Sequence, residues 1–330
     1  MHWQARPFPD ANLLLLPGPT PAVVDTGFVG HAEQTRDWAH ARSGGRIEVV
    51  VNTHWHSDHV GGNAALQATG AAIAASAPDA AAVRRRDPGC CLAEYLDQPV
   101  APYTVDIALD DGEVLRLGET EWQVVRTPGH TPGHLCLWQP DERLLVVGDA
   151  LSDYDVGWVA TALDGPDATA TALASVERIA ALHPRVLLPA HGPVPGDPEA
   201  ALAQAHRRAR RLVDDPDGAV WYGARRILAY ALIIRDGIPL HALESYLLQR
   251  AWLTDAADLL RRPAAEIATE LVDTMRRSGA VVERDGRLCT ATDYAPVDPA
   301  TLDHPWPNAW PRKLSNTGEV HHRPPQGAGR

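Results

Sequence analysis

Apolar residues recur along the first two thirds of the chain with two periods, one typical of strands and one typical of helices. Strands are predicted for a hairpin over 12–26, for 46–53 and 71–76, for several segments within 105–148, and for 186–192. Helices are predicted over 31–42, 64–69 and 166–183, and segment 86–105, with three prolines and two adjacent cysteines, is predicted to be irregular. Strands that pair with helices in this order indicate two sheets packed face to face with helices outside.

The pattern of apolar residues in the last third of the chain predicts helices and a small hairpin. One helix is expected over 199–213, and 221–294 predicts three helices and a hairpin whose turn is Arg284-Asp285-Gly286. Helices followed by a two-stranded wing resemble a small winged-helix module. The alternative, which we favour, is a helical cap that packs on the first part of the chain.

Residues 53–62 read Thr-His-Trp-His-Ser-Asp-His-Val-Gly-Gly and directly follow an apolar run. In an extended segment every second residue shares a face, so His54 and His56 can reach one cation together. Asp58 and His59 come where Gly61 and Gly62 permit a turn, and they can face a second cation nearby. Imidazole and carboxylate donors without thiolate suit zinc and tolerate iron or manganese.

Further candidate ligands lie downstream, each beside a predicted strand. His130 and His134 belong to a repeated Thr-Pro-Gly-His over 127–134, Asp149 ends the apolar run over 144–150, and His191 ends the strand over 186–192. A ligand at a strand end, on a loop held by a rigid sheet, is a common way to build a site.

Together these separated elements resemble the metallo-β-lactamase superfamily, whose pattern is His-x-His-x-Asp-His, then a His, then a Gly-Asp, then a His. The resemblance covers about residues 10–200 and implies an αββα sandwich that binds two Zn²⁺ ions, with Fe or Mn as possible substitutes. The implied ligand sets share Asp149 as a bridge and are His54, His56 and His130 for one metal, and Asp58, His59 and His191 for the other. His134 resembles the family's outer-shell histidine, which orients ligands by hydrogen bonding.

The implied chain organisation is a catalytic metallo-β-lactamase-like domain over 1–200 and a mainly helical, winged-helix-like domain over 201–294. The lactamase-β-like hydrolases, some of which cut single-stranded RNA, carry a comparable appendage. Residues 295–330, rich in Pro, Gly and polar residues, are expected to form a poorly ordered tail.

The implied chemistry is hydrolysis, in which a hydroxide that bridges two cations attacks a carbonyl carbon or a phosphorus. Asp58 and Asp149 are the predicted catalytic carboxylates beside that hydroxide. The substrate is expected to lie against segment 86–105 and against loop 152–158, in which Tyr154 and Trp158 are the candidate contacts. Related lactonases carry a Tyr shortly after the bridging Asp, and Tyr154 comes later than in that pattern.

The net charge of −12 bears on the substrate, because a strongly acidic molecule repels polyanions. We therefore expect a small acyl substrate, a thioester first, then a lactone or other ester, with RNA or another phosphodiester third. A non-enzymatic metal-binding regulator of DNA is the most distant alternative, because segment 266–278 carries Glu266, Glu270 and Asp273 and lacks a basic face. The cluster Arg207, Arg208, Arg210 and Arg211 is interpreted as a solvated helix face, and it would favour a nuclease only if it lay beside the metals.

Compartment and partners follow from the same composition. The first residues lack the apolar core of a signal peptide, and the four cysteines form no disulfide framework, so we expect a cytoplasmic enzyme. No apolar run approaches the length of a membrane span, so a membrane is not an expected partner. The net charge of −12 argues against a nucleic acid as partner. The sequence predicts no oligomeric state.

Overall fold

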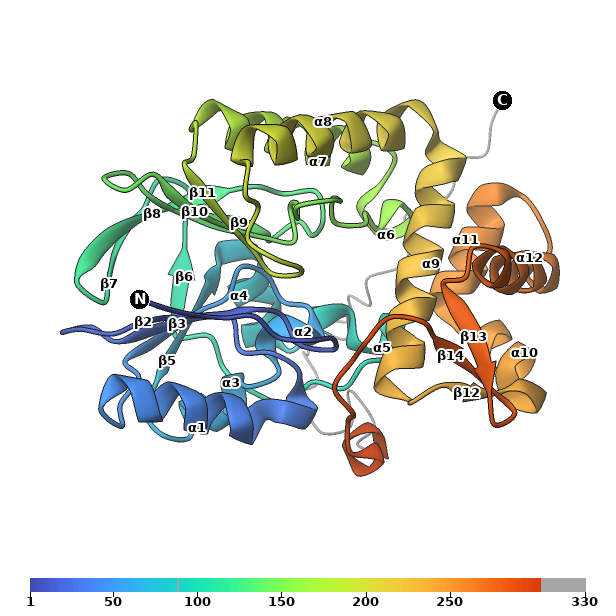
Figure 1. Ribbon diagram of the computed structural model, residues 1–330, viewed down its shortest axis with the longest axis horizontal. Helices are drawn as coiled ribbons and strands as arrows, with labels where there is room; N and C mark the ends of the chain where they lie inside the picture. The colour runs from blue at the N-terminus through green and yellow to red at the C-terminus, as the bar shows by residue number, and fades with distance from the viewer. Residues whose placement is uncertain (88, 304–330) are drawn as a thin grey trace.

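Two β-sheets lie face to face in the computed structural model, which describes residues 1–87 and 89–303 (Figure 1). The first sheet has the order β1-β2-β3-β4-β5-β6 and the second the order β11-β10-β9-β8-β7. Their bounds are β1 His2–Gln4, β2 Leu13–Leu16, β3 Ala22–Val24, β4 Val49–Val51, β5 Ala72–Ser76, β6 Ile107–Leu109, β7 Val114–Leu117, β8 Thr120–Arg126, β9 Leu135–Gln139, β10 Leu144–Gly148 and β11 Val186–Pro189.

Helices cover the outer face of each sheet. Against the first sheet pack α1 (Ala32–Ser43), α3 (Asn63–Gln67) and α4 (Ala77–Arg85), and against the second α7 (Ala168–Ala181) and α8 (Pro198–Asp214) (Figure 1). The run Leu13–Leu16 is apolar throughout because both of its faces are buried. Leu14 and Leu16 point between the sheets, whereas Leu15 points to the helices. The predicted αββα sandwich is confirmed.

The strand directions determine where the motif loops meet. β3, β4 and β5 are parallel to one another, and β10 is parallel to β11. The carboxyl ends of parallel neighbours lie at the same edge of a sheet, so the loops that leave β4, β10 and β11 can converge.

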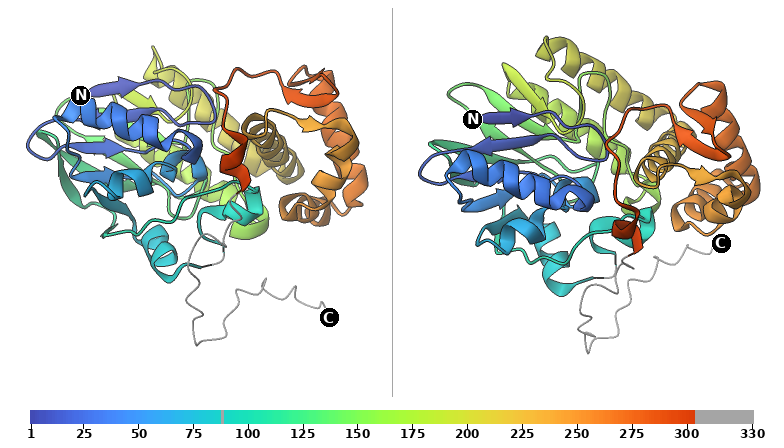
Figure 2. Two further views of the ribbon diagram at one scale, coloured as in Figure 1. Left: turned by 90° about the horizontal axis from the view of Figure 1, so that it is seen from below. Right: turned by 60° about the horizontal axis from the view of Figure 1, so that its bottom comes forward.

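The C-terminal part forms its own apolar core beside the sandwich (Figure 2). It consists of α9 (Pro216–Ile234), β12 (Ile238–Pro239), α10 (Leu240–Leu248), α11 (Ala251–Leu260), α12 (Ala264–Arg277), β13 (Val281–Arg284) and β14 (Arg287–Thr290). The expectation of three helices in 221–294 is wrong, because four are present. α10 and α11 are separated only by Gln249 and Arg250, neither of which breaks a helical pattern, so the sequence gives no sign of two helices there. The strand β12, which adds a third strand to the predicted hairpin, has only two residues.

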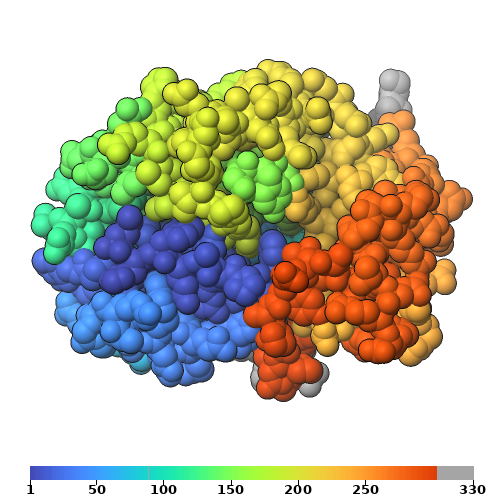
Figure 3. All heavy atoms as spheres, viewed as in Figure 1, coloured from blue at the N-terminus to red at the C-terminus, as the bar shows by residue number. Residues whose placement is uncertain are grey.

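Two further segments differ from expectation. Segment 86–105 is irregular for much of its length but contains the short helices η2 (Cys90–Leu92) and α5 (Ala93–Leu96). The expected tail begins with ordered contacts, since Ala295 N donates to Phe8 O at 2.7 Å and 299–303 form a 3₁₀ turn. In Figure 3 this segment lies against residues from the start of the chain. The rest of the expected tail, 304–330, lies outside the described residues.

None of the helices in the described ranges is long and apolar enough to cross a membrane.

Candidate metal centre

Four loops, which follow β4, β8, β10 and β11, bring the predicted ligands together. His54 and His56 follow β4, and Asp58 and His59 lie on the short helix α2 (Ser57–Val60) that begins directly after them. The others come from the loop between β8 and β9, from the residue after β10 and from the loop after β11. Within residues 1–87 and 89–303, seven side chains can hold metal ions in overlapping groups, namely His54, His56, Asp58, His59, His130, Asp149 and His191.

The first predicted set is a compact triangle of imidazole nitrogens. His56 Nδ1 lies 3.1 Å from His54 Nε2 and 2.9 Å from His130 Nε2. Donor atoms around tetrahedral zinc are roughly 3.3 Å apart, given a metal–nitrogen distance of about 2.05 Å. The distances between these nitrogens therefore fit one cation held by all three of them.

The second predicted set lies beside the first. His191 Nε2 is 3.1 Å from Asp58 Oδ2, and His59 Nε2 is 3.7 Å from the same oxygen. The aromatic ring of Phe8 stacks on His191 with 4.7 Å between ring centroids, which fixes that imidazole from the outer side.

Asp149 faces both sets with different oxygen atoms. Its Oδ2 lies 3.4 Å from His130 Nε2, and its Oδ1 lies 3.5 Å from both His59 Nε2 and His191 Nε2. Among the described residues, His59 Nε2 and Asp149 Oδ1 are buried without a hydrogen-bond partner. Buried polar atoms without partners are costly unless an ion satisfies them. The donor set therefore fits metal ions on both sides of Asp149.

The protonation states of His54, His56 and Asp149 match those of metal ligands. Burial, together with the neighbouring histidines, lowers the pKa of His54 and His56 well below the ordinary value, so both rings are neutral and can donate a lone pair. Burial alone would raise the pKa of Asp149, but His191 and His59 outweigh it and hold this pKa well below its usual range. The carboxylate is therefore ionised. Burial alone would lower the pKa of His59 and of His191, but the carboxylates around them outweigh it and raise both pKa values above the ordinary one.

Hydrogen bonds from the rear fix which ring nitrogens face the centre. His130 Nδ1 donates to Trp158 O at 2.7 Å, which leaves Nε2 as the donor to a cation. His134 belongs to none of the metal-binding groups found among the described residues. Its Nε2 accepts from the Asp149 backbone N at 3.1 Å, and a side chain at Gly148 would collide with it, since a Cβ there would lie 2.6 Å from that nitrogen.

Asp25 is a second supporting residue, and sequence reasoning missed it. It is 3% exposed, and its Oδ2 accepts from His59 Nδ1 at 2.8 Å and from Thr53 Oγ1 at 2.8 Å. Its Oδ1 accepts from Thr53 N at 2.8 Å. The available signal was an acidic residue at the end of β3, the strand paired in parallel with β4.

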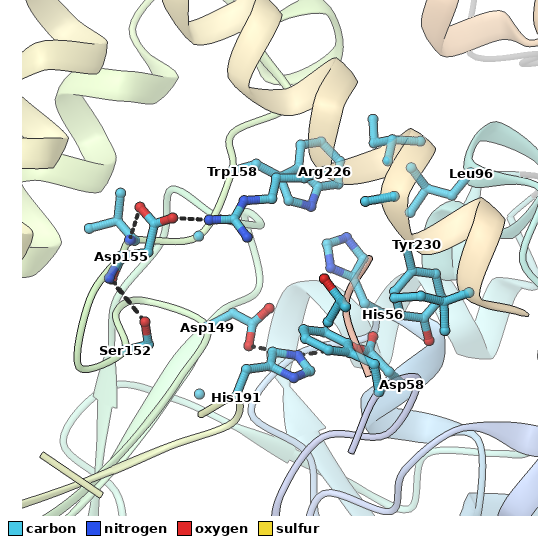
Figure 4. Close-up of a pocket in the computed structure, with 18 of the residues that line it drawn as sticks. His56, Asp58, Leu96, Asp149, Ser152, Asp155, Trp158, His191, Arg226 and Tyr230 are labelled. Carbon is cyan, nitrogen blue, oxygen red and sulfur yellow. Dashed lines mark hydrogen bonds and ion pairs between the residues drawn. The ribbon is translucent and has the colours of Figure 1, made fainter. Parts of the chain in front are cut away.

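A cavity of about 960 Å³, including its open mouth, lies next to the donors and is bounded by distant parts of the chain (Figure 4). Leu96 and Gln98 come from the predicted segment 86–105, and Tyr154 and Trp158 come from the predicted loop 152–158. Trp158 stacks on His56 with 5.6 Å between ring centroids. Sequence reasoning missed Phe8 and the whole wall formed by α9, which contributes Arg226, Ile227, Ala229, Tyr230 and Ile233.

The arginine cluster of α8 is divided between two environments. Arg207, Arg210 and Arg211 are exposed, as expected for a solvated face. Arg208 instead lies 3.5 Å from Asp155, a residue that lines the cavity. The cluster as a whole is therefore not beside the donors, although one member contacts the cavity wall.

Comparison with known proteins agrees with this geometry. The family model described as the metallo-beta-lactamase superfamily matches residues 13–191, and the chain belongs to that superfamily. The hydroxyacylglutathione hydrolase of Methylococcus capsulatus is 39% identical over 131 residues, which are 39% of this chain and 42% of that protein. The protein of the same name from Cereibacter sphaeroides is 31% identical over 168 residues, 50% of this chain and 53% of that protein. The chain thus matches about half the length of these relatives, or less.

Solved structures support the fold. A metallo-β-lactamase family protein from Thermus thermophilus aligns with a TM-score of 0.54 at 24% identity and covers 88% of this chain and 98% of its own. The BLEG-1 B3 metallo-β-lactamase aligns with a TM-score of 0.51 at 25% identity and covers 64% of this chain and 98% of its own. The first alignment extends beyond residue 191 and therefore includes part of the C-terminal region.

Proposed function

We propose that this protein is a metal-dependent hydrolase with two metal ions, zinc in the first instance, that cleaves small acyl thioesters. The observation that carries the proposal is the position of Asp149, whose two carboxylate oxygens face different histidine sets. The similarity to proteins named hydroxyacylglutathione hydrolase supports the thioester as substrate.

The first metal ion would be held by His54, His56 and His130, the second by Asp58, His59 and His191, and Asp149 would contact both. When bound, the ions would polarise the substrate carbonyl and acidify water, which is the usual contribution of such centres. The ionised Asp149 accepts hydrogen bonds only, so it orients a water molecule and can take its proton.

The other side chains of the cavity prepare the substrate for attack. Trp158 holds the His130 tautomer through its carbonyl oxygen and shields His56 with its indole ring. Apolar side chains of α9 exclude water from the opposite wall, and exclusion of water strengthens the electrostatic interactions inside the site.

The same contacts support a division of the chain into two domains with different roles. Residues 1–200 are proposed to form the catalytic domain, because they supply all seven donors. Residues 201–294 are proposed to form the helical domain that closes the cavity with α9.

The test compares three substrates with purified, metal-loaded full-length protein. We expect hydrolysis of an S-acylglutathione to exceed that of an acyl-homoserine lactone and of a labelled single-stranded RNA, and His54→Ala to abolish it. Exposed Glu33→Gln, which lies on the outer helix α1, is the control that should keep full activity. An inert thioester with efficient cleavage of RNA would overturn the choice of substrate. A His54→Ala variant that retains full turnover would overturn the metal chemistry.

A further inference from the structure

The cavity carries a positively charged corner in addition to its metal-binding end. Arg226 projects from α9 into the cavity wall, and its guanidinium group forms an ion pair with Asp155 of loop 152–158 (Figure 4). Arg208 of α8 approaches the same carboxylate at 3.5 Å. Two guanidinium groups thus share one carboxylate, which leaves one net positive charge in this corner of a chain whose overall charge is −12.

Arg226 is held along one edge only. Its Nη2 donates to Asp155 Oδ2 and lies 3.3 Å from the Tyr222 hydroxyl oxygen, which in turn donates to Val156 O at 2.5 Å. The guanidinium carbon lies 5.1 Å from the centroid of the Tyr222 ring. Within the described ranges, no residue accepts a hydrogen bond from Arg226 Nη1 or Nε, and the side chain is 39% exposed.

A guanidinium fixed at one edge and open at the other is suited to a carboxylate, which it binds through two parallel hydrogen bonds. The single net charge of the corner matches a carboxylate better than a chain of phosphates. The neighbouring wall of α9 is apolar at Ile227, Ala229 and Ile233. On this wall, Arg226 is therefore the group that can pair with a negatively charged substituent of a molecule in the cavity.

We propose that Arg226 is a specificity-determining residue that binds a carboxylate of the substrate at a distance from the scissile thioester. Asp155 orients the guanidinium and weakens its charge, and Arg208 neutralises Asp155 from the other side. This inference rests on the proposed thioester hydrolysis and adds the class of thioester that the enzyme selects, namely one with a carboxylate in the part that does not react.

The test uses two thioesters with the same acyl group, S-acylglutathione, which carries carboxylates, and S-acyl-N-acetylcysteamine, which is neutral. For Arg226→Gln we expect the ratio of KM for the anionic substrate to KM for the neutral one to rise about tenfold or more. Arg226→Lys should give an intermediate ratio, because it retains the charge but loses the planar fork. Asp155→Asn should lower the ratio below that of the parent, since it frees the positive charge and keeps the Oδ1 atom that accepts from Val156 N at 3.0 Å.

Arg207→Gln is the matched control, because it removes one positive charge from α8 at an exposed position. Its ratio should equal that of the parent. If Arg226→Gln raises both KM values equally, or if Asp155→Asn leaves the ratio unchanged, Arg226 is part of the wall only and this inference is overturned while thioester hydrolysis stands. A parent enzyme that hydrolyses neither thioester overturns the proposed function itself, and this inference with it.

Discussion

Replacement of Asp25 by Asn should weaken metal binding although Asp25 is not itself a predicted ligand. The carboxylate accepts three hydrogen bonds, from Thr53 N, Thr53 Oγ1 and His59 Nδ1. Asn has an NH₂ group in place of one carboxylate oxygen. One of the three donors of Asp25 would therefore face this NH₂ group, which cannot accept a hydrogen bond. The change is conservative for the backbone, because Asp25 has a φ of 57° and Asn is tolerated in that left-handed region.

The magnitude follows from the bond to His59. Loss of a partner that orients a ligating histidine costs on the order of 10–100-fold in metal affinity, or about 1.4–2.8 kcal/mol. The loss should fall mainly on the set of Asp58, His59 and His191, because His59 is the ligand that Asp25 contacts directly.

The assay is a competition between the protein and a chromogenic chelator for zinc, together with urea unfolding of the metal-free protein. Asp10→Asn is the matched control, because Asp10 is also a fully buried carboxylate but contacts Arg6, His31 and Phe28 N. We expect Asp10→Asn to lower the free energy of unfolding without an equal loss of affinity. An unchanged affinity in Asp25→Asn, or an equal loss in both variants, would refute the reasoning.

Three further predictions follow from the same geometry. Elemental analysis of the metal-loaded protein should approach two metal ions per chain. His54→Ala should weaken metal binding by the first set, and Asp58→Ala should weaken metal binding by the second. Saturation of the parent protein at one ion would contradict the assignment. Asp149→Ala should lower kcat by several orders of magnitude with an unchanged circular dichroism spectrum. His134→Ala should have a milder effect, since His134 contacts Asp149 through the backbone N and not through the carboxylate. Burial, partly offset by Arg126, raises the pKa of Asp79 from 3.8 to about 7. The stability that the protonated Asp79 contributes is complete below pH 3.8 and is lost as the pH rises through about 7. The free energy of unfolding of Asp79→Asn, measured in urea titrations, should therefore rise relative to that of the parent between pH 5 and pH 8, by up to about 3 kcal/mol. A gain independent of pH would count against this prediction.

The sequence could predict the donors because each stands in a short local pattern beside an apolar strand. His54, His56, Asp58 and His59 lie within six positions, and the remaining candidate ligands end or precede runs whose apolar pattern predicts strands. The structure brings all of them together, as their positions at strand ends lead one to expect. The metal load itself stays a prediction.

The cavity was less predictable, because its walls come from contacts between distant parts of the chain. The apolar residues of α9 read only as a helix, and nothing in their spacing indicates that Arg226 and Tyr230 face ligands more than 30 positions earlier in the sequence. Phe8 stands alone in a short segment before the first hairpin, and its stacking on His191 depends on the folded sandwich. Asp25 likewise acquires its role only through the pairing of β3 with β4.

The position of α9 has a consequence for how such an enzyme can change over evolutionary time. This helix forms one wall of the cavity but contributes none of the seven donors. Substitutions along it can therefore alter which molecules fit while the donor geometry, supported from behind by Asp25 and His134, stays intact. Part of the choice of substrate is thus inherited in a stretch of the chain that is separate from the donors, so that part can change without loss of the chemistry.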